Sequence, residues 1–150
     1  MIVFVCSANV WRSQVAEWFA KKFWLDAISC AGVEAKKEKY GYKPDKVITD
    51  ILLKNYDIDI SNQEIFYPED IKDKLLNAEK IMFLFDPDKV KKVDNKVLVD
   101  GMTLWEFLKK NWKKYKKNSI PDPYEKWNFE KKVVIDKIYN LIKTELWWIN

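Results

Sequence analysis

Eight residues near the N-terminus, Cys6-Ser7-Ala8-Asn9-Val10-Trp11-Arg12-Ser13, bring a thiol, small polar side chains and a guanidinium close together. A loop that wraps an anion with its backbone N–H groups needs small residues where the main chain approaches the ligand. Ser7 and Ala8 are small, and Asn9 tolerates a positive φ better than most residues. Arg12 has a planar fork that grips two phosphate oxygens. The residues expected to bind a phosphate-like anion are Ser7, Ala8, Asn9, Val10, Trp11, Arg12 and Ser13.

Cys6 opens this segment and is the candidate nucleophile. A helix N-terminus, backbone amides and Arg12 all favour the thiolate, which is the attacking species in covalent catalysis. The Ser13 hydroxyl could donate a hydrogen bond to the sulfur. The alternative is that Cys6 is an ordinary buried cysteine at a strand end and Arg12 a surface residue of a helix. The joint pattern of strand, small-residue loop, Arg-Ser and helix favours the catalytic interpretation.

Hydrolysis of a phosphate ester also requires a proton donor for the leaving oxygen. Asp122 is the candidate, because Pro121 and Pro123 hold it in a rigid segment and Pro123 biases it toward an extended backbone. The alternative is a plain Pro-Asp-Pro turn on the surface.

The chain contains no histidine and only two cysteines. This composition excludes Ser-His-Asp triads, Cys-His dyads, His-ligated metals and Cys-rich zinc sites. We therefore expect no metal and no cofactor, and the chemistry falls to Cys, Asp, Arg and backbone amides.

Hydrophobic periodicity predicts the elements that position these residues. The expected strands cover residues 2–5, 27–30, 81–85 and 97–99. The expected helices cover residues 12–24, a segment beginning at Pro44, a short segment opening at Pro68, residues 103–117 and a C-terminal segment around 133–146. Apolar strands that alternate with helices predict an α/β fold, with a parallel sheet covered on both faces. Ligands bind beyond the carboxyl ends of such strands, where the Cys6 loop lies. We expect one domain over residues 1–150.

The net charge of +4 suits anionic partners in general and does not single out nucleic acid, which we do not expect as a partner. No apolar stretch is long enough for a membrane span, and the segment after Met1 has no charged region typical of a signal peptide. The expected location is the cytoplasm.

Cys6-x5-Arg12-Ser13 on the first strand–helix turn, with Asp122-Pro123-Tyr124 late in the chain, resembles the low-molecular-weight protein tyrosine phosphatases. Further matches follow in family order over essentially the whole chain, at Cys30-Ala31-Gly32, Gly41-x-x-Pro44-Asp45, Asp57–Ser61, Glu69-Asp70 and Asp86. The resemblance implies a three-layer α/β/α fold around a four-stranded parallel sheet.

The resemblance also implies a reaction in two displacements. Cys6 would attack phosphorus while Asp122 protonates the tyrosine oxygen, and water would then hydrolyse the cysteinyl-phosphate with Asp122 as base. Arg12 would hold the phosphate oxygens throughout, and Tyr124 would line the cleft and favour an aromatic substrate. The implied partner is a phosphotyrosine protein or a small aryl phosphate.

Four positions depart from the family pattern. Ala8 replaces a typical Gly, and Trp11 stands where many members have a second Cys that can pair with the nucleophile. Cys30 could take over that pairing, or it could be a buried core thiol. The usual His that supports the loop appears as Asn62, and residues 103–118 look longer and more helical than the family's connection.

Residues 103–118 mix lysines with aromatic residues, a composition that can bind nucleic acid or an anionic surface. We favour an amphipathic helix with its lysines in water. The side chains expected to be buried on it are Leu104, Trp105, Leu108 and Trp112.

Two other functions stay open. An arsenate reductase of the same fold needs further cysteines for a disulfide relay, and no Cys follows Cys30. A non-catalytic phosphate-binding module is compatible with the changes at Ala8, Trp11 and Asn62.

Overall fold

The structure is a computed structural model that describes residues 1–6, 9, 11–31, 43–84, 98–99, 101–114 and 128–146. Its strands are β1 (Ile2–Cys6), β2 (Ala27–Ala31), β3 (Lys80–Phe83), β4 (Leu98–Val99), β5 (Met102–Thr103) and β6 (Trp112–Lys114). Its helices are α1 (Arg12–Lys22), α3 (Lys46–Tyr56), the 3₁₀ helix η1 (Pro68–Ile71), α4 (Lys72–Leu76), α5 (Leu104–Asn111) and α6 (Asn128–Glu145).

A parallel sheet with the strand order β2-β1-β3-β6 forms the centre of the fold. Strand β1 lies between two neighbours, and all five of its residues are buried. This explains why its sequence is apolar without interruption, since a parallel strand in such a sheet is covered on both faces. The predicted α/β fold with a four-stranded parallel sheet is confirmed.

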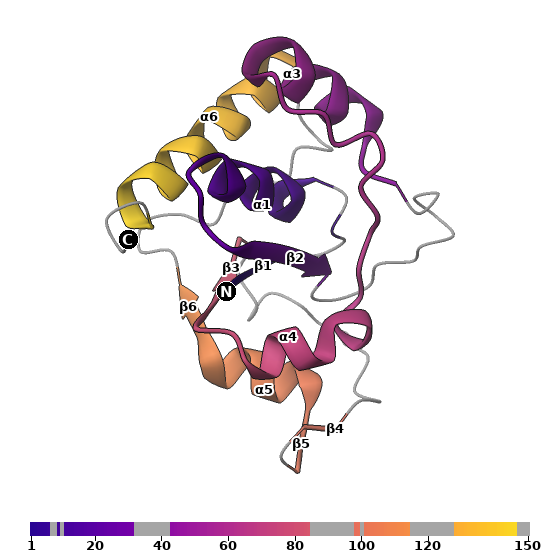
Figure 1. Ribbon diagram of the computed structural model, residues 1–150, viewed down its shortest axis with the longest axis vertical. Coiled ribbons are helices and arrows are strands. Elements are labelled where there is room, and N and C mark those ends of the chain that lie inside the picture. The colour runs from indigo at the N-terminus through magenta and orange to yellow at the C-terminus, as the bar shows by residue number, and fades with distance from the viewer. Residues whose placement is uncertain are drawn as a thin grey trace.

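Helices cover both faces of the sheet, giving three layers (Figure 1). Helices α1, α3 and α6 lie on one side, and α4 and α5 lie on the other. Side chains along β1 alternate between the two sides as the pleat requires. Phe4 and Cys6 belong to the core cluster that contains residues of α1 and α6, whereas Val3 and Val5 belong to the cluster that contains Leu75 of α4.

Helix α1 runs between the sheet and α6, and it buries polar side chains as well as apolar ones that repeat at helical spacing. It ends at Lys22, two residues earlier than expected, because the chain turns there. The backbone N–H of Leu25 donates to Ala20 O at 3.0 Å, and that of Trp24 donates to Lys21 O at 3.0 Å. This is a Schellman motif, with Trp24 in the left-handed conformation at φ 64°.

Helix α3 begins at Lys46, two positions later than the sequence suggests. Asp45 is its N-cap, and its side chain accepts a hydrogen bond from Ile48 N at 3.2 Å. Pro44 therefore precedes the cap and is not the first helical residue. The segment from Ile58 to Phe66 is connecting chain without a helix or strand.

The fourth strand of the sheet is not the one predicted. Leu98 and Val99 pair antiparallel with Thr103 and Met102 in a separate two-stranded ribbon, and the fourth parallel strand is β6, where Trp112 pairs with Ile81. Gly101 has a φ of 76°, which a hairpin turn between β4 and β5 requires. The Asp100-Gly101 pair is the sequence signal for this hairpin that we missed.

The helix predicted over residues 103–117 is wrong over residues 112–114, and residues 115–117 lie outside the described residues. Helix α5 ends at Asn111, and the chain then enters β6. The spacing of Leu104, Leu108 and Trp112 suits one helical face, but pairing of Trp112–Lys114 with β3 overrides that local preference. Within the described residues, no helix is long and apolar enough to cross a membrane.

Candidate active site

The segment from Cys6 to Ser13 joins the carboxyl end of β1 to the N-terminus of α1, as predicted. Cys6 is the last residue of β1, and Arg12 and Ser13 are the first two residues of α1. Ser7, Ala8 and Val10, three of the predicted anion-binding residues, lie outside the described residues. Asp122 and Tyr124, the predicted acid and cleft residue, lie outside them as well.

Cys6 and Ser13 are in direct contact. The distance from Cys6 Sγ to Ser13 Oγ is 3.0 Å, and both residues are buried. A thiolate can only accept a hydrogen bond, so in that state the Ser13 hydroxyl is the donor. This contact is the one that the sequence analysis expects between the two side chains.

Asn9 is the centre of the hydrogen bonds around these residues. It is fully buried and adopts the left-handed conformation, with a φ of 56°. Its Oδ1 accepts from the backbone N–H of Phe66 at 2.8 Å, which fixes the orientation of the amide. Its Nδ2 then donates to Ser13 Oγ at 2.8 Å and to Ser29 Oγ at 2.9 Å. Because Ser13 already accepts from Asn9, its own proton can point at Cys6.

A buried carboxylate closes this network on the far side. Ser29 Oγ donates to Glu17 Oε2 at 2.5 Å, and Glu17 Oε1 forms an ion pair with Lys21 at 2.7 Å. Glu17 is 1% exposed, so it depends on these partners. The sequence analysis missed both Ser29 and Glu17. Their signal was a polar residue inside an apolar strand and an acid on the buried face of a helix.

Arg12 is buried at the carboxyl ends of the central strands. Its Nη1 donates to the backbone oxygen of Leu84, just after β3, at 3.3 Å. Leu84 N donates in turn to Val5 O at 2.8 Å. The guanidinium therefore lies at the edge of the sheet where ligands bind in this class of fold.

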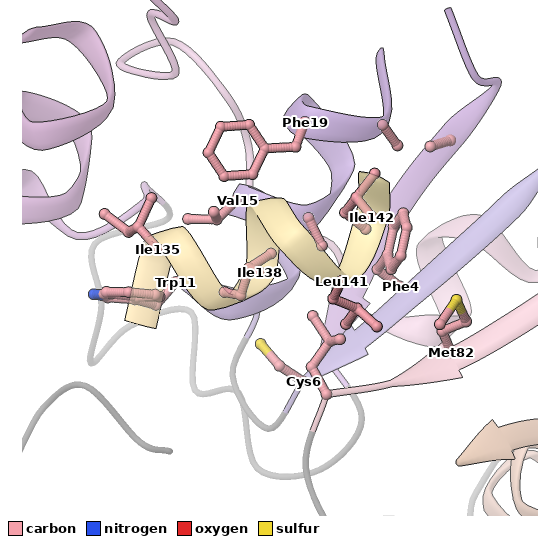
Figure 2. Packing of buried hydrophobic residues seen from close by; sticks show 14 of the residues in the cluster. Phe4, Cys6, Trp11, Val15, Phe19, Met82, Ile135, Ile138, Leu141 and Ile142 are labelled. Carbon is pink, nitrogen blue, oxygen red and sulfur yellow. The ribbon is translucent and has the colours of Figure 1, made fainter. Parts of the chain in front are cut away.

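The side chain of Trp11 lies in the hydrophobic core. It is 2% exposed and belongs to the same cluster as Val15 and Ile135, as Figure 2 shows. Among the described residues, none hydrogen-bonds to its indole Nε1. If Trp11 contacts an anion, as predicted, its backbone N–H must make that contact.

Cys30 cannot pair with Cys6. In the register of β1 and β2, Cys30 is opposite Val5, whereas Cys6 is opposite Ala31. Adjacent residues of a strand point to opposite faces, and the two cysteines accordingly lie in different core clusters. Since the chain has only these two cysteines, Cys6 has no partner for an intramolecular disulfide. Of the two interpretations of Cys30 given above, the buried core thiol is the one that the structure supports.

Asn62 does not take the place of the supporting histidine. It is exposed to solvent, whereas Gln14 of α1 is fully buried beside Asn9. Gln14 Nε2 donates to Asn9 Oδ1 at 3.2 Å and to Glu64 O at 3.0 Å. The support comes from a residue that the sequence analysis did not single out.

Residues 1–146 match the sequence model of the family described as low molecular weight phosphotyrosine protein phosphatase. The chain belongs to this family. A comparison with curated proteins finds no match. The family membership agrees with the Cys6-x5-Arg12-Ser13 motif at the carboxyl end of β1.

Solved structures share the fold at low sequence identity. The low molecular weight protein tyrosine phosphatase from T. tengcongensis is 22% identical, with a TM-score of 0.64 over 95% of this chain and 94% of that one. The arginine phosphatase YwlE from Geobacillus stearothermophilus is 14% identical, with a TM-score of 0.66 over 95% and 87%. An arsenate reductase from Archaeoglobus fulgidus is 16% identical, with a TM-score of 0.66 over 95% and 96%. The fold thus hosts three activities in these relatives.

Proposed function

We propose that this member of the family is a protein tyrosine phosphatase that hydrolyses aryl phosphate monoesters through a cysteinyl-phosphate. The observation that carries the proposal is the 3.0 Å contact between Cys6 Sγ and Ser13 Oγ, held inside a buried hydrogen-bond network at the carboxyl end of β1. A cysteine with only a structural role has no need of a hydroxyl aimed at its sulfur by a second buried side chain.

In the first step, Cys6 Sγ forms a bond to phosphorus while the bond from phosphorus to the aryl oxygen breaks. Asp122 donates its proton to that oxygen, so the phenol leaves neutral. The anion is held by Arg12 and by backbone N–H groups of the loop, which face the charge that develops on the phosphoryl oxygens.

In the second step, water attacks phosphorus, and the bond from phosphorus to Cys6 Sγ breaks. Asp122 takes the proton from the water, which restores the acid for the next turnover. Ser13 donates to the departing sulfur and stabilises it as a thiolate. In this cycle Cys6 is the nucleophile and Asp122 is the proton donor and acceptor, and no step requires a metal or cofactor.

The geometry also bears on the competing activities. An intramolecular arsenate-reductase relay would require a second thiol within reach of Cys6, and Cys30 lies on the other face of the sheet. The arginine phosphatase among the structural relatives makes phosphoarginine an alternative substrate. A proton donor at Asp122 would serve either leaving group, and Tyr124, two residues later, favours an aryl ester, whose ring suits an aromatic wall.

The test compares hydrolysis of p-nitrophenyl phosphate, a phosphotyrosine peptide and a phosphoarginine peptide by the wild type and by Cys6→Ser, Asp122→Asn and Cys30→Ser. We expect Cys6→Ser to lower turnover by roughly 10⁴-fold or more, as loss of a nucleophile does. Asp122→Asn lowers it by about 10²–10⁴-fold on the phosphotyrosine peptide. Cys30→Ser is the matched control, because the same atom change lies on the far face of the sheet.

Two results would refute the proposal. Undiminished turnover by Cys6→Ser would exclude the cysteinyl-phosphate route. No turnover by the folded wild type, together with tight binding of inorganic phosphate, would indicate the non-catalytic phosphate-binding module.

A further inference from the structure

Gln14 is a buried amide with an unusual set of neighbours. It follows Ser13 on the first turn of α1 and is fully buried. Its Nε2 lies 3.3 Å from Asn9 O, 3.2 Å from Asn9 Oδ1 and 3.0 Å from Glu64 O. All three neighbours are acceptors, so the nitrogen and not the oxygen of the Gln14 amide must face them.

Gln14 contacts Asn9, a loop residue with a positive φ. Asn9 has a φ of 56°, a region that residues other than glycine enter at a cost. Hydrogen bonds from Gln14 reach both the backbone oxygen and the side-chain oxygen of Asn9. Phe66 N donates to the same side-chain oxygen. These hydrogen bonds fix both the backbone and the side-chain amide of Asn9.

The connecting segment on the other side of Asn9 is anchored by the same interactions. Gln14 donates to Glu64 O, and Phe66 O accepts from Ala31 N, at the end of β2, at 2.8 Å. Gln14 therefore ties three parts of the chain to each other: the loop after β1, the segment before η1 and the start of α1. A displacement of any one of them would move Asn9 Nδ2 away from Ser13.

Packing alone does not account for a glutamine here. Among the described residues, none donates to Gln14 Oε1, which is buried. Burying an acceptor without a partner destabilises the folded state, and an apolar side chain of similar shape would avoid that cost. The benefit that offsets the cost is the donor group at Nε2.

We propose that Gln14 is a positioning residue, which holds Asn9 so that Asn9 directs the Ser13 hydroxyl proton to the sulfur of Cys6. The inference rests on the proposed role of Cys6 as nucleophile. The chain has no histidine, so an uncharged amide performs this support.

The test uses Gln14→Met, which keeps the length and removes the donor, and Gln14→His, whose ring nitrogen can place an N–H near the same oxygens. Gln63→Met is the matched control, because Gln63 is only partly buried and lies beside the same segment. Two rates are measured below the melting temperature of the least stable variant. They are hydrolysis of p-nitrophenyl phosphate, and alkylation of Cys6 by iodoacetamide in the Cys30→Ser background.

We expect Gln14→Met to lower kcat by on the order of ten- to a hundredfold with little change in KM, as small displacements in a reacting site do. Alkylation of Cys6 should slow as well, and Gln14→His should recover part of both rates. Gln63→Met should match the wild type in both.

A Gln14→Met variant that melts earlier but keeps both rates would show a structural role only and would overturn the inference. A failure of the proposed function gives a different pattern. In that case the wild type does not hydrolyse the ester, yet the alkylation rates still report whether Gln14 controls Cys6.

Discussion

Ser13 is the side chain that joins the buried hydrogen bonds of the loop to the sulfur of Cys6. It accepts from Asn9 at 2.8 Å and lies 3.0 Å from the sulfur. The Cys6–Ser13 contact could be predicted from the motif, because both residues flank one loop. Glu17, Ser29 and Gln14 could not, since their roles depend on α1, β2 and the segment around Phe66 meeting at Asn9.

Replacing Ser13 by alanine removes the donor to the thiolate and leaves the rest of the loop in place. A hydrogen bond to a charged group contributes about 1.5–3 kcal/mol, so we expect kcat for p-nitrophenyl phosphate to fall by roughly 10- to 100-fold. Ser61→Ala is the control, since Ser61 is exposed. Equal kcat values for the wild type and Ser13→Ala would show that the hydroxyl does not act on the sulfur.

Oxidation of Cys6 gives a second test at this scale. With Cys30 on the other face of the sheet, a sulfenic acid at Cys6 has no thiol of its own chain to react with. We expect hydrogen peroxide to inactivate the enzyme, with incomplete recovery on later addition of dithiothreitol. Cys30→Ser should lose and regain activity as the wild type does. Full recovery in the wild type but not in Cys30→Ser would contradict the strand register.

The helices and strands around the site differ in how well their structure could be predicted from their sequence. Strand β1 and helix α1 follow directly from an apolar run and a helical repeat, because the apolar residues of both pack into the core. For the segment of residues 98–114, periodicity predicts helix α5 but neither the hairpin nor β6. Its hairpin depends on Gly101, and β6 becomes a strand only by pairing with β3. Local preference is weak in such short elements, and tertiary pairing decides their structure.

The end of α1 provides a stability prediction. Trp24 has a φ of 64° and is 92% exposed, so its side chain gains little from burial while its backbone is strained. Trp24→Gly should raise the free energy of unfolding by about 1 kcal/mol, because glycine adopts this conformation without a steric cost. Trp24→Ala keeps the Cβ and should stay close to the wild type. Urea denaturation measures all three, and a destabilised Trp24→Gly would show that the indole has a stabilising contact.

At the scale of the whole molecule, the site is positioned because α1 packs between the sheet and α6 (Figure 1). Figure 2 shows Phe19 and Val15 of α1 in one cluster with Ile138 and Ile142 of α6. The layers could be predicted from the alternation of strands and helices. The strand order and the opposite orientations of Cys6 and Cys30 required the register of the paired strands.

Helix α6 offers a matched pair of substitutions at this scale. Ile138 is fully buried, whereas Val133 on the same helix is 41% exposed. Ile138→Ala should lower the free energy of unfolding by about 2–5 kcal/mol through the lost burial and the cavity left behind. Val133→Ala should change it by about 0.5 kcal/mol or less. Similar losses for the two variants, measured by urea denaturation, would show that α6 does not pack on α1 as described.

The most direct measurement is to identify the atom that carries the phosphoryl group during turnover. Asp122→Asn is mixed with p-nitrophenyl phosphate, whose leaving group needs little help from an acid, and the reaction is quenched and mapped by peptide mass spectrometry. We predict a phosphoryl group on the peptide that contains Cys6, and none after the same treatment of a Cys6→Ser, Asp122→Asn double variant. Turnover of the ester without any adduct on Cys6, or with the phosphoryl group on another residue, would contradict the mechanism.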